Sequence, residues 1–197
     1  EAFWCLVAMM EGTIQLREVL RPGFPGLVKH LYVFEKLLSQ HLKRLFLHLH
    51  ELGITSPMFA TQWFITLFGA CLPLSVVANV FDLFLVKGFV VIHRVALSLL
   101  KLSEAEILRC DFEAALSLLM NFSPRILEHP ELVFLTDNSE FTDITDASLV
   151  YLEEKFATQN ITSVDDIGSR IARTRRDKVL SKLSKLKKKI ENTLTDE

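Results

Sequence analysis

An almost wholly apolar segment runs from Ser56 to Gly88, SPMFATQWFITLFGACLPLSVVANVFDLFLVKG. Its pattern predicts two short helices joined at Cys71-Leu72-Pro73. We expect Ser56 to cap the first helix, because a serine hydroxyl can accept a hydrogen bond from the free amides of the first turn. Pro57 then occupies the first helical position, where its missing N–H group costs nothing.

The apolar residues of this segment recur at helical spacing. In the first helix Phe59, Trp63 and Leu67 lie four residues apart. Pro73 begins the second helix, and Gly88 is suited to close it. The apolar residues at helical spacing between them are Leu74, Val77, Val80, Phe81, Phe84 and Leu85. Helices that are apolar over most of their surface belong inside a protein, so we expect other helices to enclose this pair.

Several short motifs in and around this segment occur in a recognisable order. They are Phe59-Ala60-Thr61-Gln62-Trp63-Phe64, Leu67-Phe68, Leu72-Pro73-Leu74, Asp82 and Gly88, with Leu52-Gly53-Ile54 before them and Arg94-Val95-Ala96-Leu97 after them. This order resembles the C-terminal half of a TBC domain, the catalytic domain of Rab GTPase-activating proteins. Phe81 stands where that family commonly has Trp, a change that keeps an aromatic side chain in the core.

The resemblance implies an all-α fold, the rear half of a multi-helix orthogonal bundle of the TBC type. It implies a structural role for seven residues: Trp63, Phe64, Leu67, Phe68, Pro73, Asp82 and Gly88. It also implies a small GTPase of the Rab family as the partner. No cofactor is expected.

The two catalytic motifs of the family do not occur in this sequence. Family members use an arginine finger in I-x-x-D-x-x-R and a glutamine finger in Y-x-Q. Tyr32 and Tyr151, the two tyrosines, are followed by Val33-Phe34 and Leu152-Glu153, and no I-x-x-D-x-x-R occurs. The opening residues Glu1-Ala2-Phe3-Trp4 resemble the family segment that follows the glutamine finger. We therefore expect a fragment that lacks both fingers, has no catalytic residue and is not an enzyme by itself.

Composition limits the classes of function. Half of the residues are hydrophobic, and seven glycines and six prolines favour a helical fold over a turn-rich sheet. A net charge of −2 gives no overall field toward nucleic acid or membrane. Three scattered cysteines, Cys5, Cys71 and Cys110, lie in apolar runs and are expected to be buried free thiols. The best membrane-spanning candidate, residues 83–100, is interrupted by Lys87, His93 and Arg94.

The order of helices outside the central pair follows from the same spacing. We expect a loop over residues 21–26, one long helix from Leu31 to Leu52 closed by Gly53, and a helix from Phe89 to Leu102. Ser103 to Glu106 is a capping-box sequence that predicts a new helix. Asp111 is expected to cap residues 112–122, and Thr145 or Asp146 to cap a last amphipathic helix.

Three groups of residues could suggest chemistry, and each has a plainer interpretation. His41, His48 and His50 are badly spaced for a metal site, so we interpret them as packing and surface residues. Asp82 and Arg94 are more typical of a structural ion pair or helix-end partners than of an acid–base pair. Acidic residues between Glu131 and Asp166 lack the calcium-loop pattern and indicate a solvated loop. No metal site is expected.

Charge changes sign near the C-terminus. Residues 170–189 carry ten basic residues and one acid, Asp177. We divide the chain into residues 1–158, part of the helical domain, and residues 159–197, a linker with a basic amphipathic tail. A solvated helix is the plain interpretation. The alternative is contact with an anionic surface through Arg173, Arg175, Arg176, Lys185, Lys187, Lys188 and Lys189. Nucleic acid is a weaker alternative, because no aromatic residue interleaves these bases.

Two functional hypotheses remain open. The first is the structural and GTPase-contacting half of a Rab GTPase-activating domain, acting in the cytoplasm at the periphery of endomembranes. The second is a non-catalytic helical interaction module that binds a small GTPase or another protein. Intact finger motifs elsewhere in the parent protein favour the first hypothesis, and degenerate ones favour the second.

Overall fold

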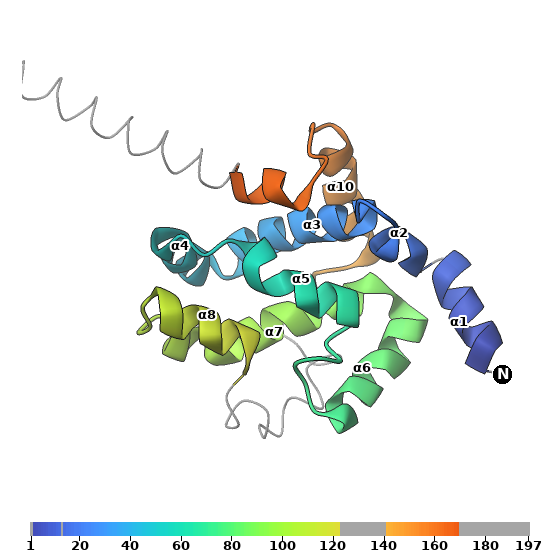
Figure 1. The fold of residues 1–197 in the computed structure, drawn as a ribbon, viewed down its shortest axis with the longest axis horizontal. Coiled ribbons are helices and arrows are strands. Elements are labelled where there is room, and N and C mark those ends of the chain that lie inside the picture. Colours follow the sequence, from blue (N-terminus) through green and yellow to red (C-terminus); the bar gives the residue numbers. More distant parts are fainter. Residues whose placement is uncertain (1, 13, 123–140, 170–197) are drawn as a thin grey trace, which may run out of the picture.

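The computed structural model describes residues 2–12, 14–122 and 141–169, and these ranges contain helices and no strand (Figure 1). The helices are α1 (Ala2–Glu11), α2 (Leu16–Leu20), α3 (Pro25–His41), α4 (Lys43–Leu52), α5 (Ser56–Thr66), α6 (Leu74–Lys87), α7 (Phe89–Ile107), α8 (Phe112–Met120) and α10 (Asp146–Ala157). A further helical segment covers residues 164–169. The expected all-α fold is confirmed.

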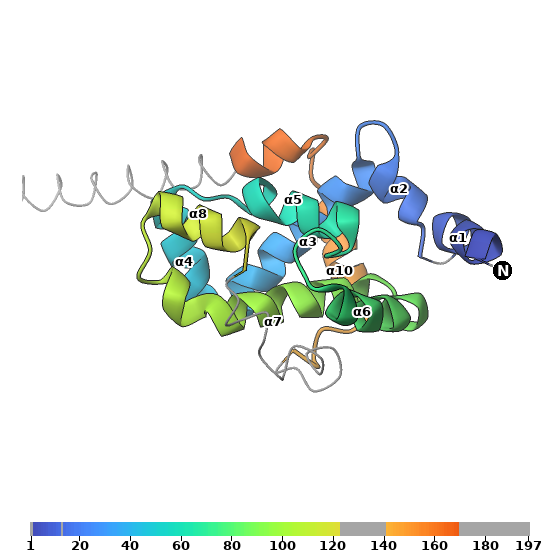
Figure 2. The ribbon, with the colours of Figure 1, turned by 60° about the horizontal axis from the view of Figure 1, so that its bottom comes forward.

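Helix α3 lies at the centre of the bundle. It packs against α2, α4, α5 and α10, while α7 packs against α6 and α8 (Figures 1 and 2). Both α3 and α7 are buried over most of their length, because their apolar residues cover more than one face of the helix. The aromatic core lies where α3, α5 and α7 meet.

The prediction of a single long helix over residues 31–52 is wrong, because two helices, α3 and α4, occupy this region. Leu42 has φ −119° and ψ 52° and separates α3 from α4. Its amide donates to Leu38 O at 3.0 Å and its carbonyl accepts from Phe46 N at 2.8 Å, so the break leaves these groups paired. Apolar residues continue at three- and four-residue steps on both sides of the break, so spacing gave no sign of it. Pro25, expected in a loop, is the first residue of α3.

The predicted helix start at Ser103 is also wrong. Helix α7 continues to Ile107. The Ser103 hydroxyl is buried and donates to the Leu99 carbonyl at 2.7 Å, one turn back in the same helix. A serine that satisfies its hydroxyl in this way can remain inside a helix, although its sequence context resembles a capping box.

Several predicted helix ends are confirmed. Gly53 closes α4 with φ 81°, and Gly88 closes α6 with φ 62°. Asp111 accepts from Ala114 N at 3.0 Å at the start of α8, and Thr145 accepts from Ser148 N at 3.4 Å at the start of α10. These residues suit such positions for reasons local to the chain, which is why the sequence revealed them.

The segment that follows α7 and α8 packs back onto α3. Lys29 Nζ lies 3.0 Å from Glu153 Oε2, and the Gln159 side-chain amide donates to the Tyr32 hydroxyl at 2.8 Å. Ile161 and Ile167 are buried in the same core. Residues 141–169 are therefore part of one packed body with α3. The predicted acidic loop ran from residue 131 to residue 166: its described part, from residue 141, contains helix α10, whereas residues 131–140 and the basic tail lie outside the described residues.

The prediction that the three cysteines are buried free thiols is only partly correct. All three are free thiols, but Cys5 is exposed, and Cys71 and Cys110 are half-buried. Burial raises the pKa of Cys71 to about 12. Within the described ranges no helix combines the length and apolar composition needed to cross a membrane.

Candidate interaction surface

The apolar motif residues of α5, Phe59, Ala60, Trp63 and Phe64, lie in the interior, whereas Gln62 is exposed. Trp63 is 1% exposed, with ring centroids 5.0 Å from Phe59, 5.7 Å from Phe68 and 5.4 Å from Phe122. Phe64 is fully buried and stands 5.8 Å from Phe34 of α3. These contacts give Trp63 and Phe64 a packing role and leave no Trp63 surface for a ligand.

Leu67 and Phe68 end α5 in the left-handed region of the backbone, with φ values of 48° and 66°. Non-glycine residues rarely adopt this conformation. The Phe68 amide donates to the Trp63 carbonyl at 2.9 Å, and both side chains are buried. Burial and this hydrogen bond hold the chain in the turn that leads to Pro73 and α6.

Of the two arrangements expected for Asp82 and Arg94, an ion pair or a helix-end contact, the ion pair is not formed in the described part of the chain. Asp82 is exposed on α6. Arg94 of α7 donates to the Ile144 carbonyl at 2.7 and 3.0 Å and to the Thr142 carbonyl at 3.2 Å. Arg94 therefore fixes the segment that precedes α10, a role that depends on residues about 50 positions away in the sequence.

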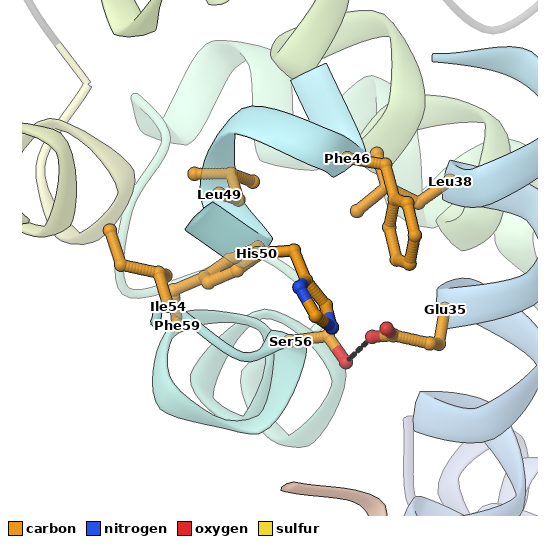
Figure 3. A pocket seen from close by; sticks show the side chains of 8 residues that line it. All are labelled: Glu35, Leu38, Phe46, Leu49, His50, Ile54, Ser56 and Phe59. Atoms are coloured by element: carbon orange, nitrogen blue, oxygen red, sulfur yellow. Dashed lines mark hydrogen bonds between the residues drawn. The ribbon is translucent and has the colours of Figure 1, made fainter. Parts of the chain in front are cut away.

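A small polar cluster joins α3 to α5 (Figure 3). The Ser56 hydroxyl donates to the Glu35 carboxylate, and the His50 ring lies beside them. Burial raises the pKa of Glu35, although the hydrogen bond from Ser56 opposes the shift. The adjoining cavity measures about 10 Å³, which holds no more than one water molecule.

This cluster corrects the expected role of Ser56. Thr55, one residue earlier, is the N-cap of α5, and Pro57 is the second residue of the helix. The Ser56 hydroxyl is bound to Glu35 across the interface between helices. Local sequence made either residue a suitable cap, and only the position of α3 decided between them.

The three histidines considered for metal binding have separate surroundings. His41 lies 3.8 Å from Asp143 and packs edge-on against Phe141. His48 Nε2 lies 3.1 Å from the Ile107 carbonyl, whereas His50 adjoins Glu35 and Ser56. The described residues contain no cluster of three or more metal-ligating side chains.

One end of the molecule exposes large apolar side chains. In α1, Phe3 is 66% exposed, Trp4 72% and Leu6 53%, and among the side chains described from residue 3 onward only Met9 is buried. In α6, Val86 is 81% exposed and Leu85 42%. Both views place α1 and α6 toward the same end (Figures 1 and 2). We call these five residues, Phe3, Trp4, Leu6, Leu85 and Val86, the apolar end.

The expectation that other helices enclose α6 is therefore only partly correct. Val76, Val77, Val80 and Phe84 are buried, whereas Leu74, Leu85 and Val86 face solvent. The apolar composition of α6 showed which of its residues are suited to burial. It did not show which face of the helix packs against another helix of this chain. An exposed apolar area of this kind is typical of an interaction site.

A hollow of about 430 Å³ adjoins the apolar end. Its walls come from α2, the start of α3, the α6–α7 turn and α10, and include Val19, Lys29, Leu85, Val86 and Val150. The Lys29–Glu153 ion pair lies on its edge. The hollow therefore has a mixed lining of apolar and charged side chains, of which Lys29 and Glu153 pair with each other.

Two buried histidines lie next to each other beneath this hollow. The sequence gave no reason to expect contact between them. His30 of α3 lines the hollow. The ring centroid of His93, on α7, lies 5.6 Å from the ring centroid of His30. Phe89 stacks on His30 at 3.8 Å, and Phe64 lies 5.0 Å from His93. Burial lowers the pKa of both imidazoles, that of His93 to about 3, so both rings are neutral near pH 7.

Comparison with known proteins adds an independent line of evidence. The model of the Rab-GTPase-TBC domain matches residues 1–108, more than half of the chain. The human ecotropic viral integration site 5 protein homolog is 34% identical over 116 residues, which are 59% of this chain and 14% of the relative. The yeast GTPase-activating protein GYP5 is 39% identical over 119 residues, which are 60% of this chain and 13% of the relative.

A third relative, Rab GTPase-activating protein tbc-11 of Caenorhabditis elegans, is 36% identical over 125 residues. These residues are 64% of this chain and 13% of the relative. The chain thus spans about a seventh of the length of the relatives it matches. The matched region holds α1 to α7, including the buried motif of α5 and the exposed face of α6. The chain belongs to the Rab-GTPase-TBC domain family.

Proposed function

We propose that this chain is the supporting and GTPase-contacting half of a Rab GTPase-activating domain. In this role the buried helices hold a rigid body, and the exposed residues meet the finger-bearing helices and the GTPase. The chain itself contains neither I-x-x-D-x-x-R nor Y-x-Q. It therefore supplies position and contact, while the chemistry belongs to GTP, magnesium and the fingers.

The observation that carries this proposal is the apolar end. The core of α3, α5 and α7 is closed, so the exposure of Phe3, Trp4 and Val86 does not reflect a generally loose fold. Exposed aromatic and aliphatic residues in one region supply the anchors of protein interfaces. Membership of the family supports a Rab GTPase as the protein that completes part of this surface.

The second candidate is a non-catalytic interaction module. The same apolar end supports it, because exposed apolar residues do not identify the partner. The two proposals differ in nucleotide dependence: a GTPase-activating domain engages the GTP-bound form, whereas a general module binds without regard to nucleotide.

Binding to a panel of Rab proteins tests the proposal. Each Rab is loaded with GDP or with a non-hydrolysable GTP analogue, and affinity is measured by interferometry. We expect at least one Rab to bind in the GTP-analogue form only. Val86→Asp should weaken this binding at least about tenfold, because a carboxylate in an apolar interface is desolvated without a partner.

Leu47→Asp is the matched control. Leu47 is 45% exposed but lies on α4, outside the apolar end, so its substitution should leave the affinity unchanged. Equal binding to GDP and GTP-analogue forms would favour the interaction module. Failure of every Rab to bind would contradict both the GTPase contact and its assignment to this surface.

The location follows from the same proposal. We propose that the protein acts in the cytoplasm at endomembranes, because its proposed partner is a Rab GTPase. The basic residues from 170 to 189, which lie outside the described residues, are proposed to add peripheral contact with an anionic membrane.

A further inference from the structure

His30 and His93, together with Ser98, are the buried polar residues of the described ranges whose side chains have atoms without a hydrogen-bond partner. His30 is 5% exposed and His93 is fully buried. Among the described residues, no hydrogen-bond partner reaches Nδ1 of His30 or either ring nitrogen of His93. Buried polar groups usually have a partner, so an exception calls for a physical explanation.

The surroundings of the pair favour neutral rings. Phe89 stacks on His30, and Phe64 lies against both rings, with centroids 6.1 Å from His30 and 5.0 Å from His93. These contacts join α3, α5 and α7 at the point where the α6–α7 turn is anchored. A proton on either ring would place a charge among aromatic side chains, which is costly without a compensating partner.

The charged groups around the pair offer no such compensation. On α3, Lys29 is cationic and is paired with Glu153 of α10. On α7, Arg94 binds the carbonyls of residues 142 and 144. Lys87 of α6 is cationic, α5 carries no charged residue, and Glu18 of α2 is paired with Arg21. Asp146 and Glu153 of α10 line the hollow, not the contact between the rings.

The hollow gives water a route to the pair. His30 forms part of its lining, and so do Gly88, Phe89 and Val90 at the start of α7. A modest outward movement of the α6–α7 turn would remove Phe89 from the His30 ring and extend the hollow to His93. Val86 is 81% exposed and a Cβ on Gly88 would meet no atom within 4 Å, so little packing holds the outer side of this turn.

We propose that His30 and His93 form a proton-sensitive latch, in which acidification favours a state with the α6–α7 turn moved off α3 and both imidazoles hydrated and charged. The latch acts on the wall of the hollow next to Leu85 and Val86. It would therefore loosen the apolar end before the remainder of the bundle. This inference concerns the fold alone and does not depend on the partner.

The sign and size follow from proton linkage. The closed state holds both rings neutral, and an open state restores the ordinary pKa of about 6.5. The two neutral histidines then contribute their full stabilisation of the closed state well above pH 6.5, and this contribution is lost as the pH falls below 6.5. Between pH 7.5 and 5.5 each histidine shifts the equilibrium toward the open state by about tenfold, and the pair by about 100-fold. The raised pKa of Glu35 acts in the opposite direction on global unfolding, because acid then favours the folded state, but Glu35 bonds to Ser56 and does not line the hollow.

Hydrogen exchange of the 197-residue chain at pH 7.5 and 5.5 tests the latch. The amides of Gly88 and Val91, bonded to Phe84 O and Gly88 O, report on the turn. After correction for intrinsic exchange, we expect their protection to fall by up to about 100-fold at pH 5.5. The amide of Asn121, bonded to Ser117 O at the end of α8, should change much less.

Variants assign the effect to the two rings. His30→Gln with His93→Gln should abolish the pH dependence, and His48→Gln should leave it intact, because His48 lies outside the pair. If the double variant does not fold, NMR of the imidazole nitrogens in the unaltered chain serves the same purpose. Constant protection at Gly88 and Val91, an equal fall at Asn121, or ordinary titration of both rings near pH 6.5 would overturn the proposal.

Discussion

Trp63 packs against aromatic side chains from several parts of the chain. Its indole packs among Phe34, Phe59, Phe68 and Phe122, so it joins α3, α5 and the segment that follows α8. A side chain of this size, buried on all sides, cannot be removed without leaving a cavity that a closely packed core fills only in part.

We expect Trp63→Ala to lower the free energy of unfolding by about 3–5 kcal/mol. Trp4→Ala provides a matched control, because Trp4 is 72% exposed and its removal should change stability by less than about 0.5 kcal/mol. Urea unfolding at pH 7.5 measures both. A loss under about 1 kcal/mol for Trp63→Ala would mean that the aromatic cluster is packed differently.

At the scale of the element, the sequence predicted features with local causes. Gly53, Gly88, Asp111 and Thr145 end or begin helices because of their own backbone and hydrogen-bonding preferences. The spacing around Trp63 also indicated a buried helix. Each of these depends on residues within about one helical turn, so a single sequence is sufficient to reveal it.

The features that the sequence did not reveal depend on contacts between distant residues. The Ser56–Glu35 hydrogen bond selects Thr55 as the cap of α5, and Arg94 binds carbonyls about 50 residues away. The break at Leu42 keeps the apolar spacing on both sides. The His30–His93 contact joins α3 to α7 without any motif. Such arrangements follow from how helices pack, which local patterns do not specify.

The contact between α2 and α3 offers a sharp test at this scale. A Cβ atom on Gly26 would lie 2.6 Å from the Glu18 carbonyl carbon and 2.7 Å from Val19 N, closer than real contacts allow. We expect Gly26→Ala to cost about 1–3 kcal/mol, although alanine favours a helix intrinsically.

Gly168→Ala is the control for this substitution. Its Cβ would meet Thr55 Oγ1 at 3.7 Å, an ordinary contact, so stability should stay the same or rise. Thermal unfolding of both variants gives the comparison. Stabilisation by Gly26→Ala would show that α2 and α3 are further apart than the structure places them.

At the scale of the whole molecule, a closed core coexists with an open apolar end. The buried face of α6 continues the core of α7, while its outer face, with Leu85 and Val86, meets solvent. The apolar residues of α6 therefore have two different roles. Those on its buried face stabilise the fold, and those on its outer face are available to a partner.

The basic tail makes a prediction of its own. Ten basic residues between 170 and 189 should give salt-sensitive binding to vesicles that contain anionic lipid, because each contributes about 1 kcal/mol near such a surface. Co-sedimentation should decline when Arg173, Arg175 and Arg176 are changed to Gln, but not when Lys36, Lys43 and Lys101 are changed. Equal binding to neutral vesicles, or no effect of salt, would support a merely solvated tail.

The central claim is that this chain contributes structure and contact, but no catalytic finger, to GTPase activation. Single-turnover GTP hydrolysis by a panel of GTP-loaded Rab proteins, with the chain in excess, tests it most directly. An arginine finger supplied in trans accelerates hydrolysis by about 10³–10⁵, so its absence should be unmistakable. We predict hydrolysis at the intrinsic rate of each Rab. Acceleration of any Rab that disappears when an arginine of this chain is substituted would contradict the account.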